Sequence, residues 1–88
     1  MIADIFRMDG KVAVVTGAGN GIGRSFALGL AAFGATVVCA DRDLPGADET
    51  VSLVKQSQGN AEAVEVDVAN ETSVSAMWDF VESEFGRA

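Results

Sequence analysis

The sequence has no tyrosine and no histidine, only one cysteine, and six basic residues against thirteen acidic ones. Without histidine, proton transfer near neutral pH lacks its usual agent. A single cysteine excludes an internal disulfide, and the carboxylates do not cluster, so no metal site is expected. A net charge of -7 argues against binding to nucleic acid or to an anionic membrane surface, because both require a basic patch.

Long hydrophobic runs are also absent. The stretch from Phe26 to Ala40 carries no charge, but Gly29, Gly34 and Thr36 interrupt it, and it falls short of the roughly 20 apolar residues of a membrane span. We interpret it as a buried helix followed by a buried strand. The N-terminus shows no secretory signal, and a lone cysteine in an apolar run is typical of a small buried side chain, which favours a reducing, cytoplasmic compartment.

What is present is an alternation of short, valine-rich runs with segments of helical periodicity. The pattern occurs three times and predicts one domain over residues 1–88, an α/β Rossmann-type open parallel sheet built from three βα units in strand order 3-2-1. The expected strands cover residues 11–16, 36–40 and 63–66. The expected helices cover residues 22–33, a segment from Pro45-Gly46 to Gly59, and a segment capped by Asn70.

Each of the three expected helices carries apolar residues at helical spacing, which predicts a face packed on the sheet. In the second helix these are Ala47, Val51 and Val54. In the first helix, which Gly34 should end in a left-handed conformation, the stripe consists of Ile22, Phe26, Ala27, Leu30 and Ala31. In the third helix it consists of Val74, Met77, Trp78, Val81 and Phe85.

A glycine-rich turn, Thr16 to Gly23, lies between the first strand and the first helix and has the pattern T-G-x-x-x-G-x-G. A dinucleotide pyrophosphate needs backbone N–H donors at close range, and a helix N-terminus entered through glycines supplies them. Gly17 would make the tight turn, Gly21 would let phosphate approach, and Gly23 would allow close helix-on-strand packing. Gly19 is either a turn residue or a ligand contact. Cofactor-binding candidates in this turn are Gly17, Asn20, Gly21, Ile22 and Gly23.

Further candidates follow the second strand. Asp41 ends it, where a carboxylate can accept hydrogen bonds from the adenosine ribose hydroxyls, although it could also be a solvated turn residue or a helix cap. Arg42 could lie against adenine or be an ordinary exposed arginine. Arg24, directly after the last glycine, is more readily interpreted as solvated than as a phosphate ligand.

Together with the opening Gly10-Lys11-Val12, these residues resemble the start of the short-chain dehydrogenase/reductase family, whose cofactor fingerprint is this glycine spacing. The resemblance covers the whole chain and about the first third of a family member, so the sheet would be truncated before its fourth strand. It implies that Asp67 and Val68, after the third strand, hold the adenine ring, although Asp67 could instead cap the next turn.

The family's catalytic residues have no counterpart here. Family members use a tyrosine as general acid/base, a lysine four residues after it, a serine and an asparagine. This chain has no tyrosine, and its lysines, Lys11 and Lys55, lie elsewhere. We therefore assign no catalytic residue and expect the isolated chain to be inactive.

The resemblance implies an intact NAD-dependent oxidoreductase that acts on a small-molecule alcohol or carbonyl compound, forms a homo-oligomer, and prefers NAD to NADP because of Asp41. One alternative is a stand-alone, non-catalytic nucleotide-binding module, and another is a poorly folded chain without activity. Without a fourth strand, residues 12–15 would form an exposed sheet edge, so the sequence also predicts self-association.

Overall fold

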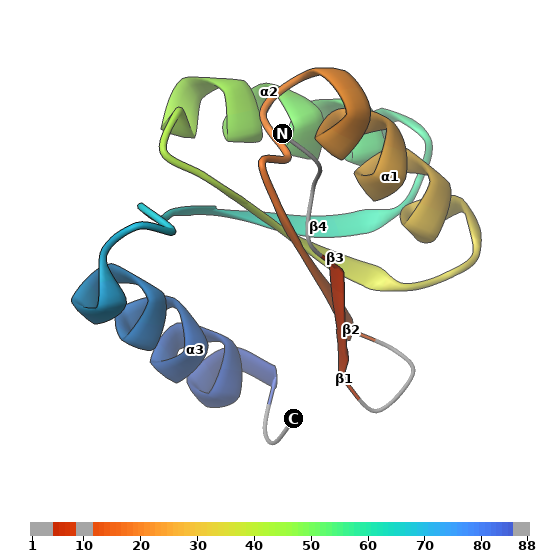
Figure 1. Ribbon diagram of the computed structural model, residues 1–88. Coiled ribbons are helices and arrows are strands. Elements are labelled where there is room, and N and C mark those ends of the chain that lie inside the picture. Colours follow the sequence, from red (N-terminus) through yellow and green to blue (C-terminus); the bar gives the residue numbers. More distant parts are fainter. Residues whose placement is uncertain (1–4, 9–11, 86–88) are drawn as a thin grey trace.

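The structure is a computed structural model that describes residues 5–8 and 12–85, with side chains in the second range. A four-stranded sheet lies between two helices on one face and one helix on the other (Figure 1). The elements are β1 (Ile5–Met8), β2 (Val12–Thr16), α1 (Gly21–Ala32), β3 (Thr36–Asp41), α2 (Leu44–Gln56), β4 (Asn60–Glu65) and α3 (Glu71–Phe85).

Three of the strands are parallel and follow the predicted order. β2 pairs with β3 from Val12↔Thr36 to Thr16↔Ala40, and β3 pairs with β4 up to Asp41↔Glu65. A helix follows each of these strands, which confirms three βα units in an open Rossmann-type sheet. β4 begins at Asn60, three residues before the predicted start, because its pairing with β3 extends the strand beyond the apolar run.

The remaining strand corrects one expectation. β1 pairs antiparallel with β2, with Ile5 opposite Val15 and Met8 opposite Val12. The prediction that residues 12–15 form an exposed edge was therefore wrong. A central, apolar strand leaves costly unpaired N–H and C=O groups, and the segment just before it can satisfy them through a short connection.

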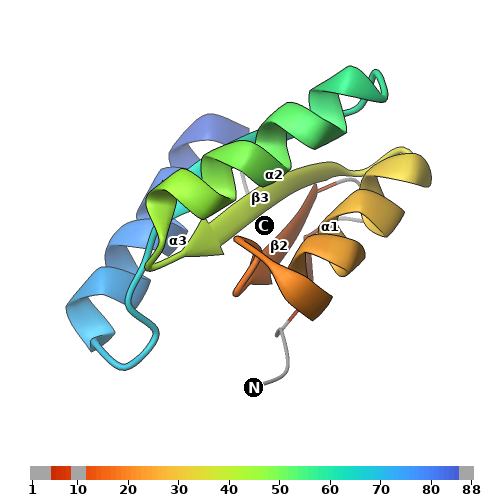
Figure 2. The same cartoon turned by 90° about the horizontal axis from the view of Figure 1, so that it is seen from above.

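Side chains of the central strands alternate between two cores, so these strands are buried on both faces as predicted. Seen from above, α1 and α2 cross one face of the sheet and α3 lies beneath the other (Figure 2). The side chains facing α1 and α2 include Val15, Val37 and Cys39. Those facing α3 include Val14, Val38 and Ala40, which pack with Met77 and Val81. The predicted stripe of α3 is thus a core face.

The predicted stripe of α1 is only partly correct. Gly34 has the expected left-handed φ of 96°, and Ala27 is fully buried. In contrast, Ile22 is 59% exposed and Phe26 is 40% exposed. The small residues Gly23 and Ala27 are the buried residues of α1, and this close approach turns the larger side chains outward.

Candidate nucleotide-binding site

The carboxyl ends of the three parallel strands meet at one edge of the sheet, as parallel pairing requires. A small cavity of about 100 Å³ opens there. It is lined by Thr16, Gly17, Asp41, Arg42, Val66 and Val68. Four residues predicted separately from the sequence, namely Gly17, Asp41, Arg42 and Val68, therefore line a single cavity.

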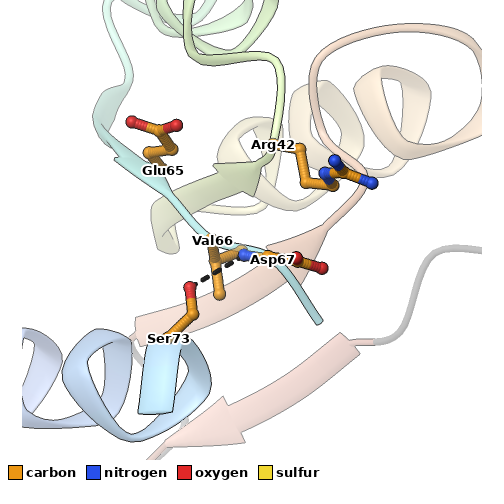
Figure 3. A pocket seen from close by; sticks show the side chains of 5 residues that line it. All are labelled: Arg42, Glu65, Val66, Asp67 and Ser73. Atoms are coloured by element: carbon orange, nitrogen blue, oxygen red, sulfur yellow. Dashed lines mark hydrogen bonds between the residues drawn. The ribbon is translucent and has the colours of Figure 1, made fainter. Parts of the chain in front are cut away.

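A larger cavity of about 470 Å³ shares Arg42 and Val66 with the first and adds Asp67, Glu65 and Ser73 (Figure 3). The Asp67 backbone N–H donates to the Ser73 hydroxyl oxygen at 2.8 Å, which anchors the turn after β4 to α3. One carboxylate oxygen of Asp67 accepts from the Ala69 N–H at 3.0 Å, so Asp67 does cap the turn. Its second oxygen has no partner among the described residues. Ser73 is not among the residues predicted from the sequence, since nothing in its local pattern marks it as a contact of the strand end.

Glycines shape the turn between β2 and α1 in two ways. Gly17 and Gly21 have φ values of 71° and 56°, conformations that L side chains rarely adopt. Gly23 is buried, and a Cβ there would overlap the Gly17 carbonyl. A Cβ at Gly21 would meet nothing within 4 Å, so the space beside this residue is open.

The N-terminus of α1 differs from those of the other two helices. In α2 the Asp43 carboxylate accepts from the Gly46 N–H at 3.1 Å, and in α3 the Asn70 side chain accepts from the Ser73 N–H at 3.1 Å. The residue at the same position of α1, Asn20, is extended and makes no side-chain cap. The first backbone N–H groups of a helix lack intrahelical acceptors, so α1 offers donors to a bound anion.

Backbone donors orient the Asp41 carboxylate. Oδ2 accepts from the Gly19 N–H at 2.7 Å, and Oδ1 accepts from the Asp43 N–H at 3.0 Å. A carboxylate has about four lone-pair sites, so these two bonds leave roughly two for a ligand. Asp41 therefore lies at the cavity in a defined orientation rather than as a free surface charge.

Arg24 corrects another interpretation, because it is not a solvated helical arginine. Its side chain is 24% exposed, and Nη2 donates to the Gly19 carbonyl at 2.5 Å and to the Gly46 carbonyl at 3.2 Å. Its Nε donates at 2.8 Å to the hydroxyl of the fully buried Thr50, which itself donates to the Ala18 carbonyl at 2.6 Å. Arg24 and Thr50 thus fasten the glycine turn to α2. No spacing rule predicts this contact, since α2 follows only after another strand.

An apolar groove of about 590 Å³ continues from the glycine turn along α1, lined by Gly21, Ile22, Ser25 and Phe26. Cys39 of β3 is a free cysteine, and it is buried in the core between the sheet and the helices α1 and α2. Burial raises the pKa of the Cys39 thiol to about 11. Across residues 5–8 and 12–85, no group of three or more potential metal ligands comes together, and no helix is long and apolar enough to cross a membrane.

A glycine turn at a helix N-terminus, followed by an acidic residue at the end of the next parallel strand, defines the class of Rossmann-type nucleotide-binding proteins. Within this class, the family model for short chain dehydrogenases matches residues 11–88. The chain belongs to the short-chain dehydrogenase family.

Curated relatives include 7alpha-hydroxysteroid dehydrogenase of Escherichia coli (strain K12), 40% identical over 85 residues, which are 97% of this chain and 33% of the relative. Another is D-threitol dehydrogenase of Mycolicibacterium smegmatis, 42% identical over 82 residues, or 93% of this chain and 32% of the relative. The chain thus spans about a third of the length of the relatives that it matches.

Solved structures agree with the family assignment. A hydroxysteroid dehydrogenase from Escherichia coli superposes with a TM-score of 0.85 at 41% identity, over 91% of this chain and 34% of the other. A metagenomic short-chain oxidoreductase in complex with NADP superposes with a TM-score of 0.85 at 33% identity, over 89% of this chain and 35% of the other. An oxidoreductase from Haemophilus influenza with bound NAD superposes with a TM-score of 0.81 at 28% identity, over 86% of this chain and 27% of the other. The structural neighbours therefore include one complex with NADP and one with NAD.

Proposed function

We propose that this chain binds the adenosine and pyrophosphate half of a nicotinamide dinucleotide, as the cofactor-binding part of an oxidoreductase. The observation that carries the proposal is the cavity at the strand ends, where Gly17, Asp41, Arg42 and Val68 meet beside the uncapped N-terminus of α1. In this arrangement the amides that begin α1, from Gly21 onward, hold the pyrophosphate.

The adenosine would occupy the two adjoining cavities. The two lone-pair sites left on Asp41 match in number the two hydroxyls of the ribose. Beyond the ribose, the adenine ring would lie between Val68, which is 51% exposed, and Arg42, with the free Asp67 oxygen accepting from its exocyclic amine. Asn20 and Ile22 would contact the cofactor from the glycine turn.

We further propose that NAD is preferred to NADP. A 2′-phosphate replaces a hydroxyl donor with an anion, so Asp41 would lose a hydrogen bond and face a like charge. Each charge-assisted bond contributes about 1.5–3 kcal/mol, which corresponds to at least about a tenfold preference. Arg42 could receive a 2′-phosphate, but it is exposed and screened by solvent, so Asp41 dominates.

The substrate of the corresponding whole enzyme would be a small-molecule alcohol or carbonyl compound, bound by a homo-oligomer in a reducing, cytoplasmic compartment. Relatives named as dehydrogenases of a hydroxysteroid and of D-threitol support an alcohol-oxidising chemistry. A second candidate is a stand-alone nucleotide-binding module without chemistry. It is favoured by β1, which covers the free edge of β2 within the chain itself.

The experiment is an NMR titration of the ¹⁵N-labelled chain with NAD. We expect the backbone amide signals of Gly17, Gly21, Asp41 and Asp67 to shift along one binding curve. Gly21→Ala should weaken binding by about tenfold or more, because it places a methyl group where the phosphate would approach and strains a residue with positive φ.

Gly29→Ala is the matched control, since this glycine lies on the exposed part of the same helix with open space around it. It should bind NAD like the wild type. Absence of any shift at the strand ends, or equal weakening by both substitutions, would refute the proposed site.

A further inference from the structure

Within the glycine turn, Gly19 is the residue that hydrogen-bonds to the Asp41 side chain. It is buried, its N–H donates to Asp41 Oδ2 at 2.7 Å, and its carbonyl accepts from Arg24 at 2.5 Å. Both backbone polar groups of Gly19 are therefore hydrogen-bonded. The N–H bonds to the Asp41 carboxylate at the end of β3, and the carbonyl bonds to the Arg24 guanidinium of α1.

No side chain fits at this position. A Cβ on Gly19 would lie 2.6 Å from Asp41 Oδ2, 3.2 Å from Asp41 Cγ and 3.3 Å from the Ala47 backbone nitrogen. Contacts under 3.0 Å are essentially never made by a real Cβ, so the carboxylate would have to move. The backbone conformation does not require glycine here, since among the described glycines only Gly17, Gly21 and Gly34 have positive φ. The need for glycine at this position is therefore steric, because a side chain here would collide with the Asp41 carboxylate.

Movement of the carboxylate would alter what Asp41 offers to a ligand. At present Oδ1 and Oδ2 are each tied to one backbone N–H, from Asp43 and Gly19 respectively, which fixes the directions of the remaining lone pairs. Hydrogen bonds weaken steeply when their angles depart from linearity. A displaced carboxylate would thus bind ribose hydroxyls less well, and it would also repel a 2′-phosphate less.

We propose that Gly19 is a positioning residue that determines the selectivity of this site for a free over a phosphorylated 2′-hydroxyl, by allowing the Asp41 carboxylate to lie against the glycine turn. The selectivity part rests on the proposed function, that is, on adenosine binding at the strand ends. The positioning part concerns only the chain itself and is measurable without a ligand.

The ligand-free measurement is amide hydrogen exchange at residue 19 by NMR. Asp41→Ala removes the acceptor, so the Gly19 amide should exchange at least about tenfold faster. The Ala18 amide, which donates to the Ala40 carbonyl at 3.2 Å, serves as an internal control and should keep its rate. In Gly19→Ala the displaced carboxylate should also release the Asp43 amide. Unchanged exchange at residue 19 in Asp41→Ala would overturn the positioning role.

The selectivity measurement uses 5′-AMP and adenosine 2′,5′-bisphosphate as probes of the adenosine site, with calorimetry on the full chain. Gly19→Ala should lower the preference for 5′-AMP by about threefold to tenfold, which is the range expected when one charge-assisted bond is weakened. Gly29→Ala, at an open position on α1, should leave the preference unchanged.

A double-mutant cycle separates this effect from a general loosening of the turn. In the Asp41→Ala background the carboxylate is gone, so adding Gly19→Ala should leave the nucleotide preference unchanged. A Gly19→Ala effect of the same size in both backgrounds, or a wild-type preference retained in Gly19→Ala, would overturn the selectivity role. If the wild type binds neither nucleotide, the proposed function fails together with the selectivity role, while amide exchange still decides the positioning role.

Discussion

At the scale of single residues, three side chains hold the glycine turn, and of these only Asp41 lines the small cavity. Arg24 of α1 and Thr50 of α2 donate to the carbonyls of Gly19 and Ala18, while Asp41 accepts from the Gly19 N–H. The conformation of the glycine turn is therefore supported by side chains on three different elements. Glycine permits this conformation, but these polar contacts select it.

Replacing Arg24 should test that support. Arg24→Ala removes bonds to two backbone carbonyls and to the buried Thr50, so we expect a loss of about 2 kcal/mol in the free energy of unfolding, measured in urea. The free energy of unfolding of Arg24→Lys should lie between those of the wild type and Arg24→Ala, because an ammonium cannot reproduce the forked hydrogen-bonding geometry of the guanidinium. Arg42→Ala is the matched control, since Arg42 is exposed, and it should change stability by less than about 0.5 kcal/mol. Equal effects at both arginines would contradict the structure.

Cys39 should make stability depend on alkaline pH. Burial raises its pKa in the folded state to about 11, so the thiol ionises earlier in the unfolded chain. The stabilisation from the protonated thiol is complete below the unfolded pKa and is lost as the pH rises toward the folded one. Relative to Cys39→Ala, the wild type should lose up to about 2 kcal/mol between about pH 8 and about pH 10.5. A constant difference between the two proteins over this range would show that the thiol ionises equally in both states.

At the scale of elements, β1 forms one edge strand of the sheet. It covers the edge of β2, which is apolar and buried on both faces, with four antiparallel pairs. At the opposite edge, β4 carries Glu62 and Glu65, both exposed, and acidic side chains discourage edge-to-edge pairing. Pairing with β1 thus protects β2, whereas charge protects the edge strand β4.

Removing β1 should produce the exposed edge of β2, and the self-association, that the sequence alone predicted for the whole chain. Deletion of residues 1–10 leaves the N–H and C=O groups of β2 unpaired, so we expect lower thermal stability and concentration-dependent self-association in light scattering. The intact chain, measured at the same concentrations, is the reference. A monomeric, equally stable protein after the deletion would mean that β1 contributes nothing to the sheet edge.

At the scale of the whole molecule, the sheet and its helices bring the residues of the proposed adenosine site to one edge of the sheet. The comparisons match the family over residues 11–88, which correspond to about a third of the relatives. Nucleotide binding by this chain and catalysis of an oxidoreduction are therefore predicted and tested separately.

We expect no turnover by the isolated chain with NADH and simple ketones, or with NAD and simple alcohols. The reason is chemical, because the sequence has neither a tyrosine nor a histidine to transfer the proton. The measurement is NADH absorbance at high protein concentration. Steady NADH oxidation by pure protein that is lost in Gly21→Trp would contradict the expectation, since it would place catalysis at this site.

The sequence by itself determined the three βα units, the order of the parallel strands and the family, because apolar periodicity and glycine spacing are local properties of the chain. It also indicated that Gly17, Asp41, Arg42 and Val68 belong together, since parallel strands bring their carboxyl ends to one edge. Boundaries depended on pairing, which extended β4 beyond its apolar run.

Only the tertiary structure decided which side chains hold that edge in place. The contacts of Gly19 with Asp41 and of Arg24 with Thr50 join residues 22 and 26 positions apart. Their geometry depends on how closely α1 packs on the sheet, which turned Ile22 and Phe26 outward. The same holds for β1, whose pairing satisfies backbone groups that exist only once β2 is folded.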